Sequence, residues 1–209
     1  MPKEKIIAQG AEALLIRKDD SLIKRRIKKS YRQKELDEKL RYGRTRRESK
    51  LLEKSSKIIN APEIKKTSKD EIKMQFIDGK RLSDDLDKFS INKSLSICKQ
   101  LGEEIALLHN NNIIHGDLTT SNMILHKEKI YFIDFGLGFI SGKIEDKAVD
   151  LHLLRQAFES KHFVRWQEYY KKSLEGYKSK SNNAGEILDR LKIVEERGRY
   201  KIKGKKRKK

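Results

Sequence analysis

Short runs of alternating apolar and polar residues dominate the first part of the chain, a pattern typical of β-strands. Three runs are separated by turns: KIIAQ (residues 5–9), EALLIRK (12–18) and SLIKRRI (21–27). A fourth run, EIKMQFI (71–77), ends at the turn residues Asp78 and Gly79. These runs predict an antiparallel sheet within residues 1–77.

A charged stretch with helical character lies between the third and fourth runs. Residues 31–56 carry leucines at positions 36, 40, 51 and 52. Because glycine is a weak helix former, Tyr42-Gly43 predicts a break into two helices. Thr45 could then cap the second helix, with Glu48 three positions later as its capping-box partner.

The remainder of the chain, residues 78–209, has mainly helical periodicity. The strongest stripe runs through Ile91–Asn110, where apolar residues recur every three or four positions. Ser83 could cap a short helix before it. Three more helices are expected at Val149–Phe158, Phe163–Tyr177 and Ala184–Glu196. The chain is thus expected to be α+β, with a strand-rich first part and a helical second part.

The segment from Ile113 to Gly136, IIHGDLTTSNMILHKEKIYFIDFG, holds the candidate chemistry. Two apolar runs, at 122–125 and 130–133, flank a Lys–Glu–Lys turn, which predicts a hairpin. The ends of this hairpin carry Asn122 and Asp134, and Asp117 precedes it. A carboxylate at a reacting oxygen, followed by an amide and a carboxylate that bind magnesium, suits phosphoryl transfer. The simpler alternative is that these are ordinary turn residues.

Composition narrows the choice of partners. The formal net charge is +19 and the sequence pI is about 9.8, which favours polyanionic partners. No apolar run approaches the ~20 residues of a bilayer span, and the N-terminus lacks the form of a signal peptide. A soluble cytoplasmic protein is therefore expected. The single cysteine, Cys98, excludes an internal disulfide and is interpreted as a core residue rather than a catalytic thiol.

The last residues, RGRYKIKGKKRKK (197–209), are strongly basic. So many like charges are expected to be disordered on their own. They could form an arm that binds phosphate backbones, or they could be a solvated tail. The candidate nucleic-acid contacts are Arg197, Arg199, Lys201, Lys203, Lys205, Lys206, Arg207, Lys208 and Lys209.

The order H-x-D-x-x-x-x-N followed by D-F-G resembles the catalytic segments of protein kinases. The resemblance implies a two-lobed kinase-like fold with a minimal C-lobe. It also implies that Asp117 is the catalytic base or water orienter, and that Asn122 and Asp134 hold magnesium. By the same resemblance His115 braces the loop. Asp150 anchors the loop backbone, although it could instead be an unremarkable acid at a helix start.

The kinase pattern further implies an ATP site in the first 77 residues. Lys24, which directly follows Leu22-Ile23, is the catalytic lysine on the phosphates, with Lys28 as the alternative, and Glu48 would hold that lysine. The turn around Gly10 would lie on phosphate or would be a plain hairpin turn. The residues implied to bind ATP are Ile7, Gln9, Gly10, Ala11, Glu12, Ala13, Leu15, Lys24, Glu48, Met74, Gln75, Phe76 and Ile77, the last four at adenine.

A narrower resemblance rests on QGAEA, RTRRES, HGDLTTSNMIL and DFGLGFISGKIEDKAVDL. Together these motifs are similar to the small kinase-like subunits of KEOPS, the complex that makes threonylcarbamoyladenosine on tRNA; RIO kinases are broader relatives. The resemblance implies ATP and magnesium dependence, weak Ser/Thr kinase activity and ATPase activity within the complex. The implied partners are the threonylcarbamoyl-transferring subunit, a small subunit on the N-lobe, and tRNA.

Three departures from ordinary kinases favour hydrolysis over peptide phosphorylation. Gly116 stands in place of an arginine that would pair with an activation-loop phosphate, and Thr119 replaces a lysine. Only fourteen positions separate Gly136 from Asp150, which leaves little room for a peptide platform. The rival interpretations are a Ser/Thr protein kinase, including a stand-alone RIO-like one, a small-molecule phosphotransferase, and a nucleic-acid-binding pseudoenzyme.

Overall fold

A computed structural model describes the backbone of residues 4–206 and the side chains of residues 4–197. The chain forms two compact units. The first comprises the residues up to Gly79 together with Ile124–Gly138. The second comprises Lys80–Met123 and the residues from Phe139 onward.

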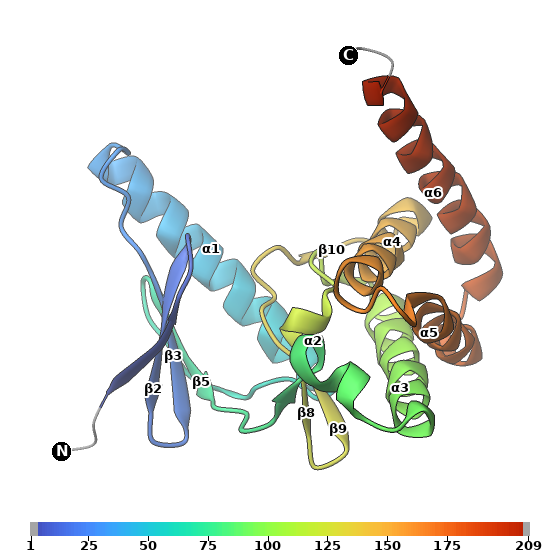
Figure 1. Cartoon of the computed structure of the whole chain (residues 1–209). Helices are drawn as coiled ribbons and strands as arrows, with labels where there is room; N and C mark the ends of the chain where they lie inside the picture. Colours follow the sequence, from blue (N-terminus) through green and yellow to red (C-terminus); the bar gives the residue numbers. More distant parts are fainter. Residues whose placement is uncertain (1–3, 207–209) are drawn as a thin grey trace. The chain divides into compact units, whose positions relative to one another are not determined.

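The first unit contains a five-stranded antiparallel sheet with the strand order β1-β2-β3-β5-β4. Figure 1 labels β2, β3 and β5 of this sheet. Its strands are β1 (Lys5–Gln9), β2 (Ala13–Lys18), β3 (Ser21–Arg26), β4 (Ile64–Thr67) and β5 (Glu71–Gln75). The four predicted strands are present. The sequence pattern missed β4, an edge strand in which only Ile64 is apolar and the other three residues are exposed. A mostly exposed edge strand lacks the alternation on which the prediction depended.

One continuous helix, α1 (Lys34–Ser55), accompanies this sheet and packs against β4 and β5. The predicted break at Tyr42-Gly43 is therefore wrong. Gly43 lies on the exposed side, where a side chain would meet nothing within 4 Å, so it costs the helix only about 1 kcal/mol. Burial of Leu51 and Leu52 stabilises the turns of α1 that follow Gly43. Thr45 is consequently a buried mid-helix residue and caps nothing.

The predicted hairpin is confirmed. It consists of β8 (Met123–His126) and β9 (Lys129–Phe132). The two turn residues, Lys127 and Glu128, have φ values of 47° and 61°, the left-handed pair that twists a two-residue hairpin correctly. The hairpin is tied to the first unit where Phe132 donates its amide to the Asn60 carbonyl at 3.0 Å. Asp134 follows β9 after one residue, Ile133, and belongs to the first unit.

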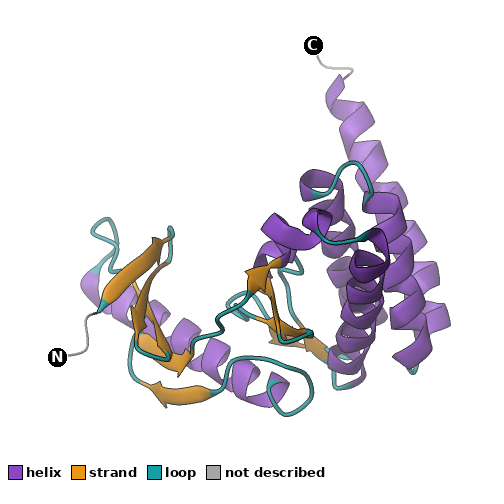
Figure 2. Ribbon diagram, turned by 60° about the horizontal axis from the view of Figure 1, so that its bottom comes forward, coloured by secondary structure: helices purple, strands orange, loops and turns teal. Residues whose placement is uncertain are grey.

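The second unit consists mainly of helices joined by short elements (Figure 2). Two pairs pack side by side: α3 (Ile91–Asn110) with α5 (Trp166–Lys180), and α4 (Ile144–Lys161) with α6 (Ala184–Lys206). The short elements are β6 (Lys80–Arg81), α2 (Leu82–Asp85), η1 (Leu86–Lys88), β7 (Ile113–Ile114), η2 (Thr120–Asn122) and β10 (Phe139–Ile140). β7 pairs with β10 and leads directly into the candidate catalytic loop.

The helix stripe predicted at Ile91–Asn110 coincides with α3, and Cys98 lies fully buried on it. Burial raises the pKa of the Cys98 thiol well above its usual range, as expected for a core cysteine. Gly102 of α3 and Gly176 of α5 let the two helix backbones approach each other. A Cβ atom on Gly102 would overlap the Ser173 carbonyl, and one on Gly176 would overlap the Lys99 carbonyl.

Several predicted helix ends are wrong. α4 begins at Ile144, so Asp150 lies inside the helix rather than at its start. The residue before α2 is Arg81, and Ser83 donates to the adjacent Asp84 instead of capping. The α6 backbone continues to Lys206, where disorder was expected; lysine and arginine favour helices, and extending an existing helix is easy. Residues 207–209 lie outside the described residues.

Over the part of the chain that the structure describes, no helix combines the length and apolar character needed to cross a membrane.

The close approach of α3 and α5 yields a stability prediction. Gly102→Ala should lower the free energy of unfolding by about 1–3 kcal/mol, because the added methyl group has no room beside the Ser173 carbonyl. Gly43→Ala is the matched control on an open helix face, and it should raise stability by about 0.4–1 kcal/mol. Urea unfolding followed by circular dichroism measures both. Equal stability of Gly102→Ala and wild type would contradict the close packing.

Candidate active site

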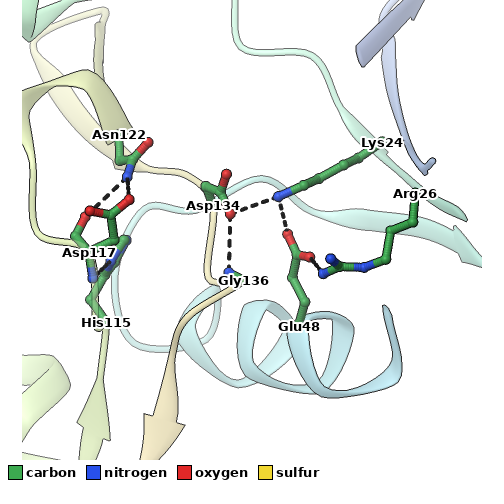
Figure 3. Close-up of polar contacts among 8 residues, drawn as sticks. All are labelled: Lys24, Arg26, Glu48, His115, Asp117, Asn122, Asp134 and Gly136. Atoms are coloured by element: carbon green, nitrogen blue, oxygen red, sulfur yellow. Dashed lines mark hydrogen bonds and ion pairs between the residues drawn. The ribbon is translucent and has the colours of Figure 1, made fainter. Parts of the chain in front are cut away.

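Lys24 lies at the centre of an ion cluster in the first unit. Its Nζ atom is 2.7 Å from Glu48 Oε1 and 2.7 Å from Asp134 Oδ1 (Figure 3). The three residues come from β3, α1 and the segment after the hairpin. Lys28, the alternative lysine, follows the end of β3 and has no such contact among the described residues. Lys24 is thus the lysine that the fold pairs with both carboxylates.

Glu48 is almost fully buried, with 2% of its side chain exposed, and it holds a second cation. Arg26 donates to Glu48 Oε2, while Lys24 donates to Oε1. The sequence interpretation did not include Arg26, which stood within a run of basic residues. The alternative capping role of Glu48 is wrong, because α1 does not begin there. The one carboxylate therefore binds two cations that are themselves largely buried, and Asp134 supplies a second negative charge beside Lys24.

The charge state of Lys24 follows from these contacts. Burial alone would lower the pKa of Lys24, but the charges of Glu48 and Asp134 and the hydrogen bonds to them outweigh burial. The pKa of Lys24 is consequently raised, and the amine is charged throughout the physiological range. A permanently charged ammonium is the form that can attract nucleotide phosphates.

Asp134 occupies an unusual backbone conformation, with φ of 63°. Aspartate tolerates this left-handed region better than most residues. Its Oδ1 atom accepts the Gly136 amide at 3.1 Å in addition to Lys24 (Figure 3). The carboxylate is 46% exposed, so solvent and ligands can reach it.

The candidate catalytic loop follows β7 in the second unit, and α4 holds its backbone. The buried carboxylate of Asp150 accepts the amides of His115 and Gly116, each at 2.9 Å. Gly116 has φ of 76°, a conformation that glycine adopts without strain. The structure thus places Asp150 against the loop backbone from an interior position of α4.

Asp117 and Asn122 meet within this loop. The Asn122 Nδ2 atom donates to Asp117 Oδ2 at 2.8 Å and to the Asp117 carbonyl at 3.1 Å. His115 is fully buried and accepts the Asp117 amide on Nδ1 at 3.3 Å. Figure 3 shows the amide oxygen of Asn122 turned away from Asp117. The nitrogen of Asn122 thus holds the Asp117 carboxylate in place.

A buried histidine that the sequence interpretation missed supports Asp150. His109 Nε2 lies 3.2 Å from Asp150 Oδ2, and its Nδ1 lies 2.9 Å from the Tyr177 hydroxyl. The residue ends an apolar helix stripe, so its spacing alone gave no sign of this contact. The pKa of Tyr177 is raised by burial, so its hydroxyl stays protonated. A series of hydrogen bonds therefore connects α5 to the loop through three buried groups: the Tyr177 hydroxyl, the His109 ring and the Asp150 carboxylate.

The other predicted ATP residues lie in the first unit. Gly10 donates its amide to the Ala13 carbonyl at 2.9 Å in the turn between β1 and β2, and Glu12 pairs with Arg44 at 2.6 Å. Ile7 is exposed at a bulge in β1, and Leu15 lies opposite Lys24 in the sheet register. Gln9, Ala11 and Ala13 complete this turn.

Some backbone amides of residues 74–77, which were predicted to contact adenine, already donate hydrogen bonds to neighbouring segments. The amides of Gln75 and Phe76 donate to the carbonyls of Glu63 and Asp20. Met74 and Ile77 are buried. A backbone contact with adenine would consequently need the Ile77 amide or carbonyl groups rather than the amides of Gln75 or Phe76.

The two predicted magnesium ligands, Asp134 and Asn122, each carry an oxygen donor. Among the described residues, no group of three or more His, Cys, Asp or Glu side chains could hold a metal ion. Asp134 offers a carboxylate in the first unit and Asn122 offers an amide oxygen in the second. Magnesium normally takes one or two protein ligands and completes its shell with water and substrate phosphates.

The basic C-terminal residues are only partly described. Arg197 pairs with Glu145 at 2.8 Å, and Arg190 contacts the same carboxylate at 3.0 Å. The Arg197 side chain is 62% exposed. The side chains of Arg199, Lys201, Lys203, Lys205 and Lys206, and all of Arg207, Lys208 and Lys209, lie outside the described residues.

Comparison with known proteins identifies the family to which the chain belongs. Residues 16–138 match the RIO domain model. The chain is 40% identical to the KEOPS complex subunit Bud32 of Pyrococcus abyssi, over 94% of this chain and 96% of that one. It is 43% identical to a probable bifunctional tRNA threonylcarbamoyladenosine biosynthesis protein of Methanocaldococcus jannaschii. That match covers 94% of this chain but 37% of the relative, so the chain spans little more than a third of the bifunctional protein.

A solved structure matches the fold. The Rio2 kinase of Chaetomium thermophilum, in a complex with ADP, Mg²⁺ and phosphoaspartate, aligns with a TM-score of 0.61 over 96% of this chain and 71% of that one. Sequence identity is 14%, so the likeness shows a kinase-like fold alone. The predicted α+β kinase-like fold is confirmed. With the RIO domain and the near-complete match to the archaeal subunit, the chain belongs to the RIO-domain family and, within it, to the KEOPS Bud32 subunits.

Proposed function

We propose that this chain is an ATP- and magnesium-dependent kinase-like ATPase that serves threonylcarbamoyladenosine modification of tRNA as a subunit of a KEOPS-type complex. The observation that carries the proposal is the charged amine of Lys24 held between Glu48 and Asp134 at 2.7 Å from each. Such a fixed cation beside a metal-binding carboxylate is the arrangement that phosphoryl transfer from a nucleotide requires. Its relatives with KEOPS or tRNA-modification titles support the biological setting.

Each residue has a defined task in this proposal. Lys24 attracts the phosphates of ATP, and the turn around Gly10 lies against them. Asp134 and Asn122 hold magnesium, which when bound neutralises phosphate charge. Asp117 orients a water molecule or a serine hydroxyl toward the phosphorus, and the Asn122 amide nitrogen fixes its carboxylate. Positioning and electrostatic stabilisation supply most of the rate enhancement in such sites.

Water is the favoured acceptor, with weak Ser/Thr protein kinase activity or autophosphorylation as a side reaction. Thr119 provides no cation near the transferring phosphate, unlike the lysine of ordinary Ser/Thr kinases. The segment after Gly136 enters β10 at Phe139, and α4 begins at Ile144. So short a connection leaves little surface on which to align a peptide. A stand-alone RIO-like protein kinase is the competing proposal, since the RIO domain match fits it equally well.

The proposed partners follow from the relatives and from charge. The bifunctional relatives combine a region like this chain with further sequence, which supports docking on the threonylcarbamoyl-transferring subunit. A small KEOPS subunit would bind the first unit. The net charge of +19 supports direct contact with tRNA, through the basic residues from Arg197 onward.

Asp117→Ala tests the catalytic assignment. We expect ATP turnover, measured with the transferase subunit and tRNA present, to fall by at least ~100-fold, because the water loses its orienting base. Phosphoprotein and free phosphate should be counted separately, so that hydrolysis and protein phosphorylation are resolved. Asp84→Ala, an exposed acid of α2, is the matched control and should leave turnover unchanged. Equal turnover of Asp117→Ala and wild type would refute the assignment.

Glu48→Gln tests the ion cluster. The neutral amide would leave the largely buried Lys24 and Arg26 without a counter-charge in α1, and the free energy of unfolding should fall by about 3–5 kcal/mol. Lys24→Met should cost less, because Arg26 still neutralises Glu48. Guanidinium unfolding at pH 7 measures both variants. The reverse order of the two losses would show that Glu48 is not the shared counter-ion.

The raised pKa of Lys24 can be tested by measuring how the stability of wild type and Lys24→Met depends on pH. A raised pKa means that the pairing stabilises the fold below the unfolded-state value of about 10.4 and is lost as the pH rises through the folded-state value. The stability difference between wild type and Lys24→Met should therefore be constant from pH 6 to pH 9. A difference that shrinks within that window would contradict the assigned charge.

Removal of residues 198–209 tests the basic arm while keeping the Arg197–Glu145 pair. Affinity for tRNA should fall, and the slope of log affinity against log salt should flatten by about 0.7–0.9 for each phosphate that the arm no longer neutralises. A tail of equal length with glutamine at the basic positions controls for chain length. Unchanged tRNA affinity at low salt would count against the arm.

A further inference from the structure

We propose that Asp87, His162 and Thr120 form a positioning relay that fixes the turn carrying Asn122. The inference rests on the proposed function, since it assigns these three residues to the loop of the same reaction. All three belong to the second unit, and none was singled out by the sequence patterns. They come from η1, the residue after α4, and η2.

The ring of His162 connects the other two residues. Its Nδ1 atom lies 2.6 Å from Asp87 Oδ2, and its Nε2 atom lies 3.1 Å from Thr120 Oγ1. A carboxylate only accepts hydrogen bonds, so Nδ1 carries the proton in this contact. In the neutral ring Nε2 is then an acceptor, and the Thr120 hydroxyl donates to it. The carboxylate thereby selects the tautomer that can bind Thr120.

Two aromatic side chains pack against the His162 ring and restrict its rotation. The centroids of Phe158 and Tyr169 each lie 5.9 Å from the His162 centroid, and both meet its ring at steep angles. The histidine is 2% exposed. Packing therefore fixes the ring plane, and the two hydrogen bonds fix its direction within that plane.

Thr120 is the first residue of the 3₁₀ turn that ends at Asn122. The residue before it, Thr119, makes no side-chain cap bond to this turn. The Asn122 amide donates to the Thr119 carbonyl at 2.9 Å, and the Asn122 side chain then reaches Asp117. A hydroxyl bond on Thr120 consequently anchors the turn from its buried side while Asn122 faces the reaction.

An Asp–His–hydroxyl series also occurs in hydrolases, where the hydroxyl is the nucleophile. Burial decides against that role here. Thr120 has 0% of its surface exposed, so no substrate carbon or phosphorus could reach Oγ1. The same burial suits a positioning group, because a hydrogen bond shielded from water is costly to break.

The test compares two substitutions at one position. Thr120→Val has nearly the same shape but no hydroxyl, and Thr120→Ser keeps the hydroxyl. In hydrogen exchange of the protein without nucleotide or metal, Thr120→Val should speed exchange of the Thr119–Met123 amides by about tenfold. Thr120→Ser should stay within about twofold of wild type. Amides of the β8–β9 turn report whether the effect is local.

Turnover then links the relay to function. Thr120→Val should lower kcat for ATP hydrolysis by about tenfold or more and raise the magnesium concentration needed for half-maximal rate. KM for ATP should change by less than about threefold, because Lys24 and the Gly10 turn are untouched. His162→Phe should resemble Thr120→Val, and the double variant should be no worse than either, as expected for two members of one relay.

Each outcome decides the proposal. If Thr120→Val fails to fold, Asp87→Ala serves instead; the Asp87 side chain is 47% exposed, and its loss should give a smaller change in the same direction. Wild-type exchange in a folded Thr120→Val or Asp87→Ala protein would overturn the relay. A wild type that hydrolyses no ATP with its partners would overturn the proposed function, while the exchange comparison still judges the relay.

Discussion

The buried carboxylate of Glu48 is the group on which the first unit depends. A single buried carboxylate pairs with two cations, Lys24 and Arg26. Without it Arg26 would lose this acid partner, and Lys24 would keep only the half-exposed carboxylate of Asp134. Because the cations come from β3 and the anion from α1, the ion cluster also sets how the helix lies on the sheet. The cluster ends at Asp134, so the position of the hairpin segment is linked to the same charge balance.

The second unit also contains a buried carboxylate, and hydrogen bonds rather than cations satisfy it. Asp150 is a buried anion whose two oxygens are satisfied by loop amides and by His109, so its charge serves to hold backbone. In both units a carboxylate from the interior of a helix organises a segment that contains irregular backbone. Helices are rigid, so they transmit the position of the core to the loops, which could not hold such conformations alone.

The sequence predicted those features that depend on local order. The hairpin and the α3 stripe follow from periodicity, and the spacing of His115, Asp117 and Asn122 survives in the loop because these residues are close along the chain. Arg26, His109 and His162 could not be predicted in this way. Their partners lie 22, 41 and 75 positions away, and no short pattern encodes which distant acid a basic residue will meet. The extent of α1 was misjudged for a related reason: tertiary packing outweighed the weak propensity of Gly43.

The left-handed conformation at Gly116 lets Asp150 hold the loop backbone through contacts inside the second unit. Ordinary protein kinases carry an arginine at this position, which an activation-loop phosphate can pair with. Here the residue is glycine at φ 76°, so the conformation costs little, and the Asp150 carboxylate holds its amide permanently. The ties to the loop are buried and internal to the second unit. Together with the short segment between Gly136 and α4, these ties support the proposal of a site that works without a phosphate-operated switch.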